Sequence, residues 1–192
     1  LSAAVTLNAI APITINSAQI PVGDPSTDTL MLMYGNAHGA PQGETITDTA
    51  GATTQYSVGS LPSFVVGDRV VAAPATRTAP CNLVLDTVTA VSATQVGVAP
   101  PGSSDASLGT LFNFGATPRV LAYAVRRGNL TVCDYLANDC GAACTNVDGP
   151  LGTIVGGTCN GNWVPVSSNI VSLRAEYGRD TSVPMDSVVD VF

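Results

Sequence analysis

The chain contains a single imidazole, His38, which is the first residue to consider for catalytic chemistry. It lies in a glycine-rich segment, Gly35 to Pro41, that follows a run of apolar residues. A Ser–His–Asp triad needs a serine held on a rigid, sharp turn, and the sequence has no G-x-S-x-G motif to supply one. A Cys–His pair would need a free thiol, and we expect the cysteines to be bridged. We therefore expect His38 to be a solvent-exposed loop residue and the protein not to be an enzyme.

Carboxylates are the next candidates for chemistry. Glu44 and Glu176 are the only glutamates, and most aspartates stand beside Gly, Pro, Ser or Thr, where Asp normally bonds to its own backbone in turns. Three aspartates near the C-terminus, Asp180, Asp186 and Asp190, are weak candidates for a cation site, because their spacing lacks the alternation of a calcium loop. The sequence has no phosphate-binding loop, dinucleotide fingerprint or H-E-x-x-H motif. We expect no metal, no cofactor and no small-molecule substrate.

The cysteines have the spacing C-x6-C-x3-C-x14-C over Cys133, Cys140, Cys144 and Cys159. A structural zinc site normally shows two closely spaced ligand pairs, and only Cys140/Cys144 is such a pair, with no histidine near it. We therefore expect disulfides and an oxidising compartment. The expected pairs are Cys133–Cys159, which bracket the loop, and Cys140–Cys144, which can close locally, although four cysteines allow three connectivities. Cys81 is left unpaired or with a partner outside the chain.

Composition excludes several classes of protein. The 192 residues include no lysine and carry a net charge of −7, so the concentrated positive charge that binds nucleic acid or anionic lipid is absent. A hydrophobic fraction of 45% with 11% charged residues excludes intrinsic disorder. No apolar run approaches the 18 or so residues of a membrane span. The start at Leu1 lacks an initiator Met and a signal sequence, so we expect a processed product or an excised domain.

Short runs of β-type residues separated by turn residues recur along the whole chain, which predicts a mainly β fold with antiparallel sheets and little helix, as one domain over residues 1–192. The predicted strands are Thr14 to Ala18, Asp28 to Tyr34, Thr54 to Val58, Arg69 to Ala73, Asn82 to Val91, Gln95 to Ala99, Leu111 to Phe114, Val120 to Val125, Leu130 to Tyr135, Trp163 to Val166 and Ser187 to Phe192.

Two segments need separate comment. The strands on either side of Arg126-Arg127-Gly128-Asn129 predict a tight hairpin, in which Gly128-Asn129 is a pair that favours positive φ. The segment Asn169 to Tyr177 fits both a helical and an alternating pattern. We expect a short helix or turn at Ser167 to Ile170 that leads into a strand.

Several short stretches, taken in their order along the chain, form a pattern that says more about the protein's family than composition does. They read Asp28-Thr-Leu30-x-Leu32, Gly67-Asp68-x-Val70, Cys81 followed by Leu85 to Thr89, the hairpin Val120 to Leu136, Ile170-x-x-Leu173-x-x-x-Tyr177-Gly178-x-Asp180, and Ser187 to Phe192. Over most of Asp28 to Phe192 this arrangement resembles the PilW-type minor pilins of bacterial type IV pili. The Tyr177-Gly178-x-Asp180 element is its most specific part. An acidic loop that often follows this element in the family is replaced here by Thr181 to Met185, which removes the ground for a metal role.

The resemblance implies a pilin-type head, in which an antiparallel sheet packs one face against an apolar N-terminal helix and the C-terminal region is linked by disulfides. It implies a non-enzymatic structural role in pilus assembly or at the pilus tip, in a cell-surface filament or at the periplasmic face of the envelope. The partners would be other pilins or minor pilins, through the head and the helix, and membrane contact would be through that helix. A leader and an apolar helix encoded before Leu1 would settle the class of the protein. We also expect the sheet either to expose an apolar face or to cover it with Leu1 to Ile15.

Two alternatives stay open. A pseudopilin of a type II secretion system would have a related head. A secreted adhesin or carbohydrate-binding module would instead present two or three coplanar aromatic rings. The large candidates are Trp163 and the five tyrosines, and we expect most of them to pack in the core or against loops: Tyr34, Tyr56, Tyr123, Tyr135 and Tyr177.

Overall fold

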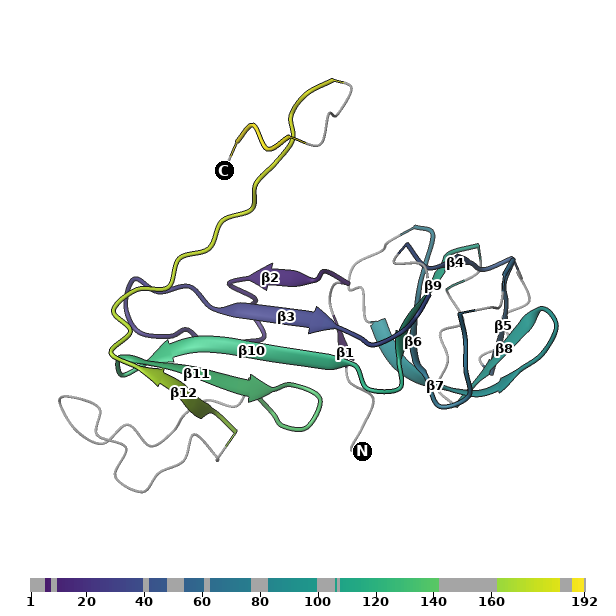
Figure 1. Ribbon diagram of the computed structural model, residues 1–192, viewed down its shortest axis with the longest axis horizontal. Coiled ribbons are helices and arrows are strands. Elements are labelled where there is room, and N and C mark those ends of the chain that lie inside the picture. Colours follow the sequence, from purple (N-terminus) through teal and green to yellow (C-terminus); the bar gives the residue numbers. More distant parts are fainter. Residues whose placement is uncertain are drawn as a thin grey trace. The chain divides into compact units, whose positions relative to one another are not determined.

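The structure is a computed structural model, shown in Figure 1. It describes residues 6–7, 10–39, 42–47, 54–60, 63–76, 83–99, 106, 108–141, 162–183 and 188–191. The described residues form β-strands and irregular segments without an α-helix, and the strands pair antiparallel, as predicted. In this part of the chain there is accordingly no helix with the length and apolar character needed to cross a bilayer.

The chain divides into two compact units, each with its own sheet. Unit 1 comprises Leu1–Pro12 and Met33–Val120, and unit 2 comprises Ile13–Leu32 and Leu121–Phe192. The prediction of a single domain over residues 1–192 did not include this division.

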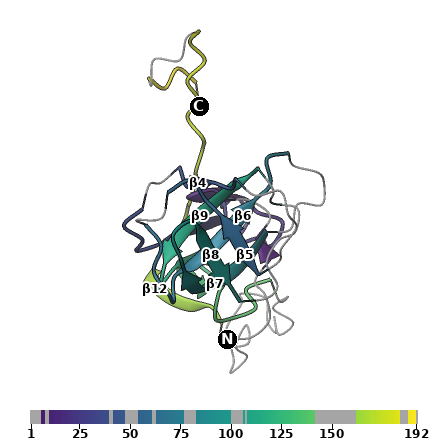
Figure 2. The ribbon, with the colours of Figure 1, turned by 90° about the vertical axis from the view of Figure 1, so that its right-hand side faces the viewer.

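Unit 1 is a closed barrel, and its strands face the viewer in Figure 2. Its strands are β1 (Thr6–Leu7), β4 (Glu44–Thr45), β5 (Gln55–Ser57), β6 (Arg69–Ala73), β7 (Leu83–Val91), β8 (Gln95–Val98) and β9 (Thr110–Gly115). They follow the order β4-β9-β6-β7-β8-β5, with β1 also paired to β7. An antiparallel bridge between Ile46 and Val58 joins the ends of β4 and β5, so the sheet closes on itself and leaves no free edge there.

The barrel interior is filled by apolar side chains from alternate positions of these strands. Val70, Val96 and Leu111 are fully buried, and they share one core with Ile46, Tyr56, Val58, Phe64, Ala72, Val88, Val98 and Ala106. Most of them are β-branched or small, which suits packing inside a narrow barrel.

Unit 2 contains a five-stranded antiparallel sheet in the order β12-β11-β10-β3-β2. The strands are β2 (Ile13–Ile15), β3 (Leu30–Tyr34), β10 (Arg119–Arg126), β11 (Asn129–Asp134) and β12 (Val164–Ser168). One face carries a buried core of Ile20, Ala122, Cys133 and Cys140, against which Tyr135 and Trp163 pack. The chain passes from one unit to the other at three places: between Pro12 and Ile13, within β3 after Leu32, and within β10 after Val120.

The predicted hairpin is present, with a different pair at its centre. Arg126 pairs with Asn129, so Arg127 and Gly128 are the central residues, and both have positive φ (56° and 69°). The prediction that Gly128-Asn129 would form the tight turn was therefore wrong. The carboxylate of Asp24 explains the register, because its two oxygens accept hydrogen bonds from the Arg127 and Gly128 amides at 2.8 and 2.7 Å.

The segment after β12 also differs from prediction. Ser167 and Ser168 end β12, Asn169 has a φ of 61°, and residues 169–177 form neither helix nor strand. Their backbone groups bind elsewhere: the Ile170 amide donates to the Gly128 oxygen, and the Leu173 oxygen accepts from the Asp28 amide. We call residues 169–177 the strap. Ser187 to Phe192, predicted as a strand, contributes one isolated bridge, between Arg179 and Val191.

Candidate functional site

His38 lies on the loop after β3 in unit 1 and is exposed, as expected. Its neighbour Gly39 approaches Ser63 so closely that an added Cβ would lie 2.6 Å from the serine Cβ. Among the described residues, however, no hydrogen bond joins His38 to a serine or a carboxylate. The described part of the loop therefore does not assemble a catalytic triad.

The C-terminal aspartates are engaged in local backbone and hydroxyl contacts. One carboxylate oxygen of Asp190 accepts hydrogen bonds from the Thr181 amide, the Thr181 hydroxyl and the Ser182 hydroxyl at 2.8 to 3.1 Å. These bonds, led by that from the Thr181 amide, lower the pKa of Asp190. Asp180 accepts from the Ser182 amide, and Asp186 lies outside the described residues. Within the described residues, no three His, Cys, Asp or Glu side chains come together as a metal site would require.

The structure pairs Cys133 with Cys140, with the two Cα atoms 5.9 Å apart. The expected pairs Cys133–Cys159 and Cys140–Cys144 were therefore wrong for these two residues. The reason is a tight turn after β11, in which the Asp134 oxygen accepts from the Ala137 and Asn138 amides and returns the chain toward its starting point. Cys81, Cys144 and Cys159 lie outside the described residues.

Tyr177, in the element most specific to the resemblance, lies beside the edge strand of the unit 2 sheet. Its hydroxyl accepts a hydrogen bond from the Ile15 amide at 2.8 Å and donates one to the Ile13 oxygen at 3.3 Å. The strap that carries it is held by Asp28, whose carboxylate accepts from the Ala175 amide at 2.9 Å and from the Asn16 side chain. The bond from Asn16, followed by that from Ala175, lowers the pKa of Asp28.

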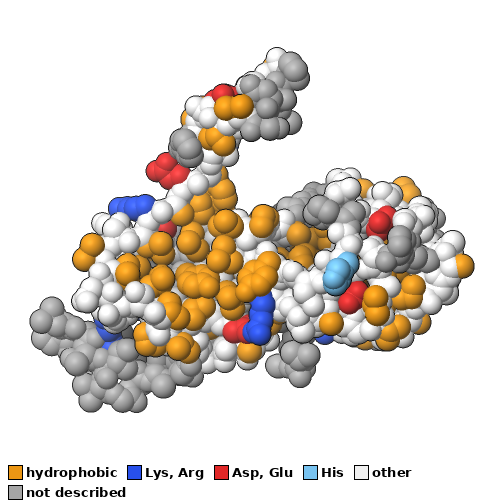
Figure 3. Space-filling view, in the orientation of Figure 1, with side chains coloured by type: hydrophobic (Ala, Val, Ile, Leu, Met, Phe, Trp, Pro, Cys, Tyr) orange, Lys and Arg blue, Asp and Glu red, His pale blue; other side chains and the backbone are white. Residues whose placement is uncertain are grey.

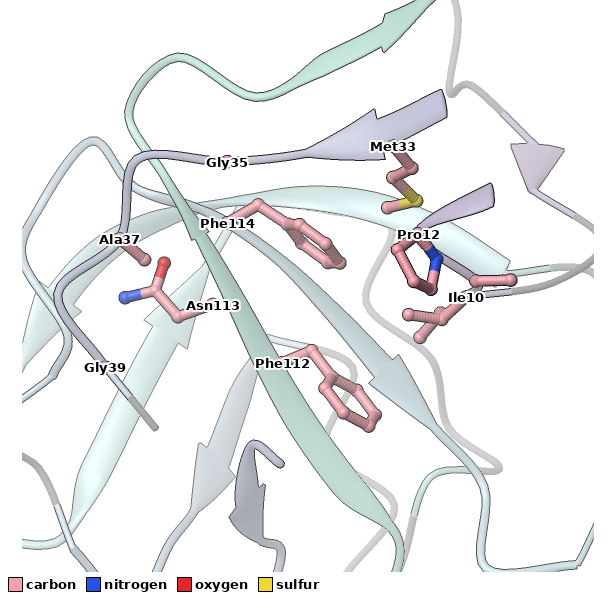
Figure 4. Close-up of a pocket in the computed structure, with 10 residues that line it drawn as sticks. Ile10, Pro12, Met33, Gly35, Ala37, Gly39, Phe112, Asn113 and Phe114 are labelled. Carbon is pink, nitrogen blue, oxygen red and sulfur yellow. The ribbon is translucent and has the colours of Figure 1, made fainter. Parts of the chain in front are cut away.

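A hollow of about 410 Å³ opens on unit 1 (Figure 4). Phe112 and Phe114 point to the same side of β9, toward Met33, Pro12 and Ile10. Asn113, between the two phenylalanines, donates from its side-chain amide to the Ser63 oxygen and to Asp68. The lining has no charged side chain, so the hollow suits an uncharged apolar group.

Unit 2 also has an apolar surface on its sheet. Buried and half-buried positions alternate along β3, along residues 120–124 of β10 and along residues 130–134 of β11, so the half-buried side chains share the face opposite the core. Asp134, opposite Leu121, is a charged residue at the end of this face. Figure 3 shows hydrophobic side chains gathered over this sheet. We call this surface the apolar face, formed by Ile13, Ile15, Leu30, Leu32, Leu121, Tyr123, Leu130, Val132 and Val164.

The apolar face is accessible to a partner. Ile13 at one side of the sheet is 45% exposed and Val164 at the other is 54% exposed. Cross-strand pairs such as Tyr123–Val132 and Ile13–Leu32 make its surface continuous from strand to strand. The sequence predicted either an exposed apolar face or one covered by Leu1 to Ile15. Within that segment, residues 13–15 belong to the sheet itself as its edge strand.

The structure also contains a buried carboxylate that the sequence analysis did not single out. Asp86 on β7 is 3% exposed, and one of its oxygens has no hydrogen-bond partner. Burial raises the pKa of Asp86 to about 7, with Arg69 on β6 acting in the opposite direction. The sequence does contain a signal for this buried carboxylate. Asp86 stands within the mostly apolar stretch Leu83 to Val88, where a β-strand would turn it toward the same side as Val88.

Comparisons with known proteins add no assignment. No protein-family model, no curated protein and no solved structure matches the chain.

Proposed function

We propose that this chain is a non-enzymatic structural protein, a minor-pilin-like head whose unit 2 sheet packs against an apolar α-helix during assembly of a type IV pilus. The observation that carries the proposal is the apolar face, because a continuous exposed apolar surface on a sheet is a site of contact far more often than a chance feature. A helix with an apolar stripe is a natural covering for a sheet of this kind.

Both edges of the same sheet favour contact through its face. At one edge, the Tyr177 hydroxyl occupies backbone groups of β2. At the other edge, β12 contains Pro165, which has no amide hydrogen, and its pairing with β11 is irregular between Leu130 and Thr131. Proline and irregular pairing are common means of preventing strand addition. The face is therefore the better surface for a partner.

The competing carbohydrate-binding function has weaker support. Trp163 packs against the unit 2 core, and the guanidinium of Arg126 lies 4.4 Å from its ring centroid, so that ring face is already occupied. Tyr56 is buried in the barrel. A stacking platform for a sugar needs open ring faces side by side, which these residues do not offer.

The test replaces an apolar side chain on the face with a charge. Val132→Asp places a carboxylate in the middle of the apolar face, whereas Val171→Asp places one at a valine that is 94% exposed on the strap and serves as the matched control. We expect immobilised wild-type chain to retain detergent-solubilised mature minor pilins, and Val132→Asp to reduce retention at least about tenfold, because burying an unpaired charge is costly. Val171→Asp should retain them as the wild type does.

Thermal unfolding of both variants separates lost binding from lost folding. Equal retention by wild type and a folded Val132→Asp variant would contradict the proposal. So would strong saccharide binding on a glycan array that Trp163→Ala abolishes.

A further inference from the structure

The outer edge of β2 has backbone groups that point away from the sheet. On the sheet side, the Pro12 oxygen accepts from the Met33 amide and the Asn16 amide donates to the Thr29 oxygen. Because bonding direction alternates along an antiparallel strand, residues 12, 14 and 16 point inward and residues 13 and 15 point outward. Among the described strands β2 lies at the edge of its sheet, so no strand bonds to the outward groups of Ile13 and Ile15.

The Tyr177 hydroxyl occupies two of these outward groups. It accepts from the Ile15 amide and donates to the Ile13 oxygen, and so takes the place that one rung of a neighbouring strand would take. The strap holds it there through the bonds of Asp28 to the Leu173 oxygen and the Ala175 amide. A single side chain from residue 177 thus closes an edge formed by residues 13–15.

The edge that Tyr177 closes is complementary to itself. In an antiparallel pairing centred on Thr14, Ile13 of one copy lies opposite Ile15 of the other. The Ile15 amide of each copy would then donate to the Ile13 oxygen of its partner, which are the same two groups that Tyr177 now bridges. The strand Ile13-Thr14-Ile15 has no charged side chain, so two copies can approach there despite a net charge of −7 on each chain.

The apolar face gives this pairing a second source of stability. Ile13 lies opposite Leu32 and Ile15 opposite Leu30, so these side chains share the apolar face. In a pairing through β2, Ile13 of each copy would contact Ile15 of the other on this face, and cross-strand contacts between β-branched side chains stabilise a sheet. A two-fold arrangement of this kind is the commonest form of protein dimer.

We infer that the Tyr177 hydroxyl closes a strand-addition site on β2, and that removing it lets this edge pair with β2 of a second copy of the chain. The inference concerns the edge of the sheet and does not depend on what covers its face, so it stands or falls separately from the proposed pilin role.

The experiment compares Tyr177→Phe and Tyr177→Ala with Tyr34→Phe. Tyr34 is a matched control, because its exposed fraction is 53% against 54% for Tyr177 and none of the described residues bonds to its hydroxyl. We expect sedimentation equilibrium to show tighter dimerisation of the Tyr177 variants, by about fivefold for each net hydrogen bond gained between the copies. Wild type and Tyr34→Phe should associate equally weakly.

Amide hydrogen exchange at low concentration, where the copies are separate, tests the guarding contact itself. Ile15 should exchange at least about tenfold faster in Tyr177→Phe than in wild type or Tyr34→Phe, while amides in β10 and β11 keep their rates. Unchanged exchange at Ile15 would contradict the guarding role. Dimerisation of the Tyr177 variants no tighter than that of wild type would contradict the strand-addition site. A third variant, Ile15→Pro in the Tyr177→Ala chain, removes the outward amide of β2 and should abolish any dimer formed through this edge.

Discussion

At the scale of single residues, aspartate carboxylates make the contacts that hold parts of unit 2 together. Asp24 fixes the hairpin turn through two amides, and Asp28 holds the strap to the sheet. The sequence correctly predicted that many aspartates would bond to nearby backbone, because their neighbours favour turns. It did not predict these two long-range contacts, because they depend on strands far apart in the chain. The Cys133–Cys140 pair was missed for a similar reason, since it depends on a turn formed by backbone hydrogen bonds.

Asp86 should make the stability of the barrel fall as pH rises from about 4 to about 7. Its pKa is about 7 in the folded barrel, whereas an aspartate in an unfolded chain has a pKa of about 3.9. Between these values the folded state binds more protons than the unfolded state, so the free energy of unfolding decreases with rising pH, by up to about 1.4 kcal/mol per pH unit. Asp86→Asn should remove this dependence and stabilise unit 1 at pH 8.

Urea unfolding at pH 4.5, 6 and 8 measures the effect, with Glu176→Gln, a change at an exposed carboxylate, as the control. A slope with pH that is the same in wild type, Asp86→Asn and Glu176→Gln would show that Asp86 is not the group responsible.

At the scale of elements, alternation of apolar residues located the strands well. The predictions for β3, β6, β7, β8, β9, β10 and β11 overlap the observed strands closely. Their apolar residues either alternate with burial, as in β3 and β8, or form a short buried run, as in β6. The strap was not predicted, because its apolar residues fit two patterns and its conformation is set by contacts with Gly128 and Asp28. Closure of the barrel was not predicted either, since it depends on a bridge between two short segments, at Ile46 and Val58.

Alanine substitution at two glycines with positive φ distinguishes backbone strain from steric collision as the cause of lost stability. Gly115 at the end of β9 has a φ of 75°, and an added Cβ would collide with the Asn36 side chain and lie 2.6 Å from the Ala37 nitrogen. Gly128 has a φ of 69°, and the nearest atom to its added Cβ is 3.9 Å away. We expect Gly128→Ala to destabilise unit 2 by about 1 kcal/mol, and Gly115→Ala to destabilise unit 1 by at least about 2 kcal/mol more.

Hydrogen exchange read by mass spectrometry resolves the two units and gives the free energy of opening for each. If both alanine variants lose the same free energy of opening, the loop after β3 moves aside for the added methyl group at position 115, which would contradict the prediction.

At the scale of the whole molecule, the chain combines a closed barrel with a sheet that has one covered face and one open apolar face. Short runs of β-type residues separated by turn residues predicted the mainly β class and the antiparallel sheets. It did not predict two units, because both have the same kind of short strands and no change in composition marks the boundary. The proposed role as a minor-pilin-like head rests on the open face, on the guarded edges of the same sheet, and on a resemblance over most of Asp28 to Phe192 whose most specific part is the Tyr177 element.

The most direct test of that role is a photo-cross-linking measurement on the apolar face. A benzophenone amino acid is placed at position 123, in the centre of the face, or at position 22, where Val22 is 85% exposed on a loop of the same unit. Each chain is mixed with mature minor pilins and irradiated, and the cross-linked peptides are identified by mass spectrometry. We expect position 123 to cross-link to the apolar N-terminal helix of a minor pilin and position 22 not to do so. Cross-links of equal yield from both positions, or none from position 123 to any helix, would contradict the account.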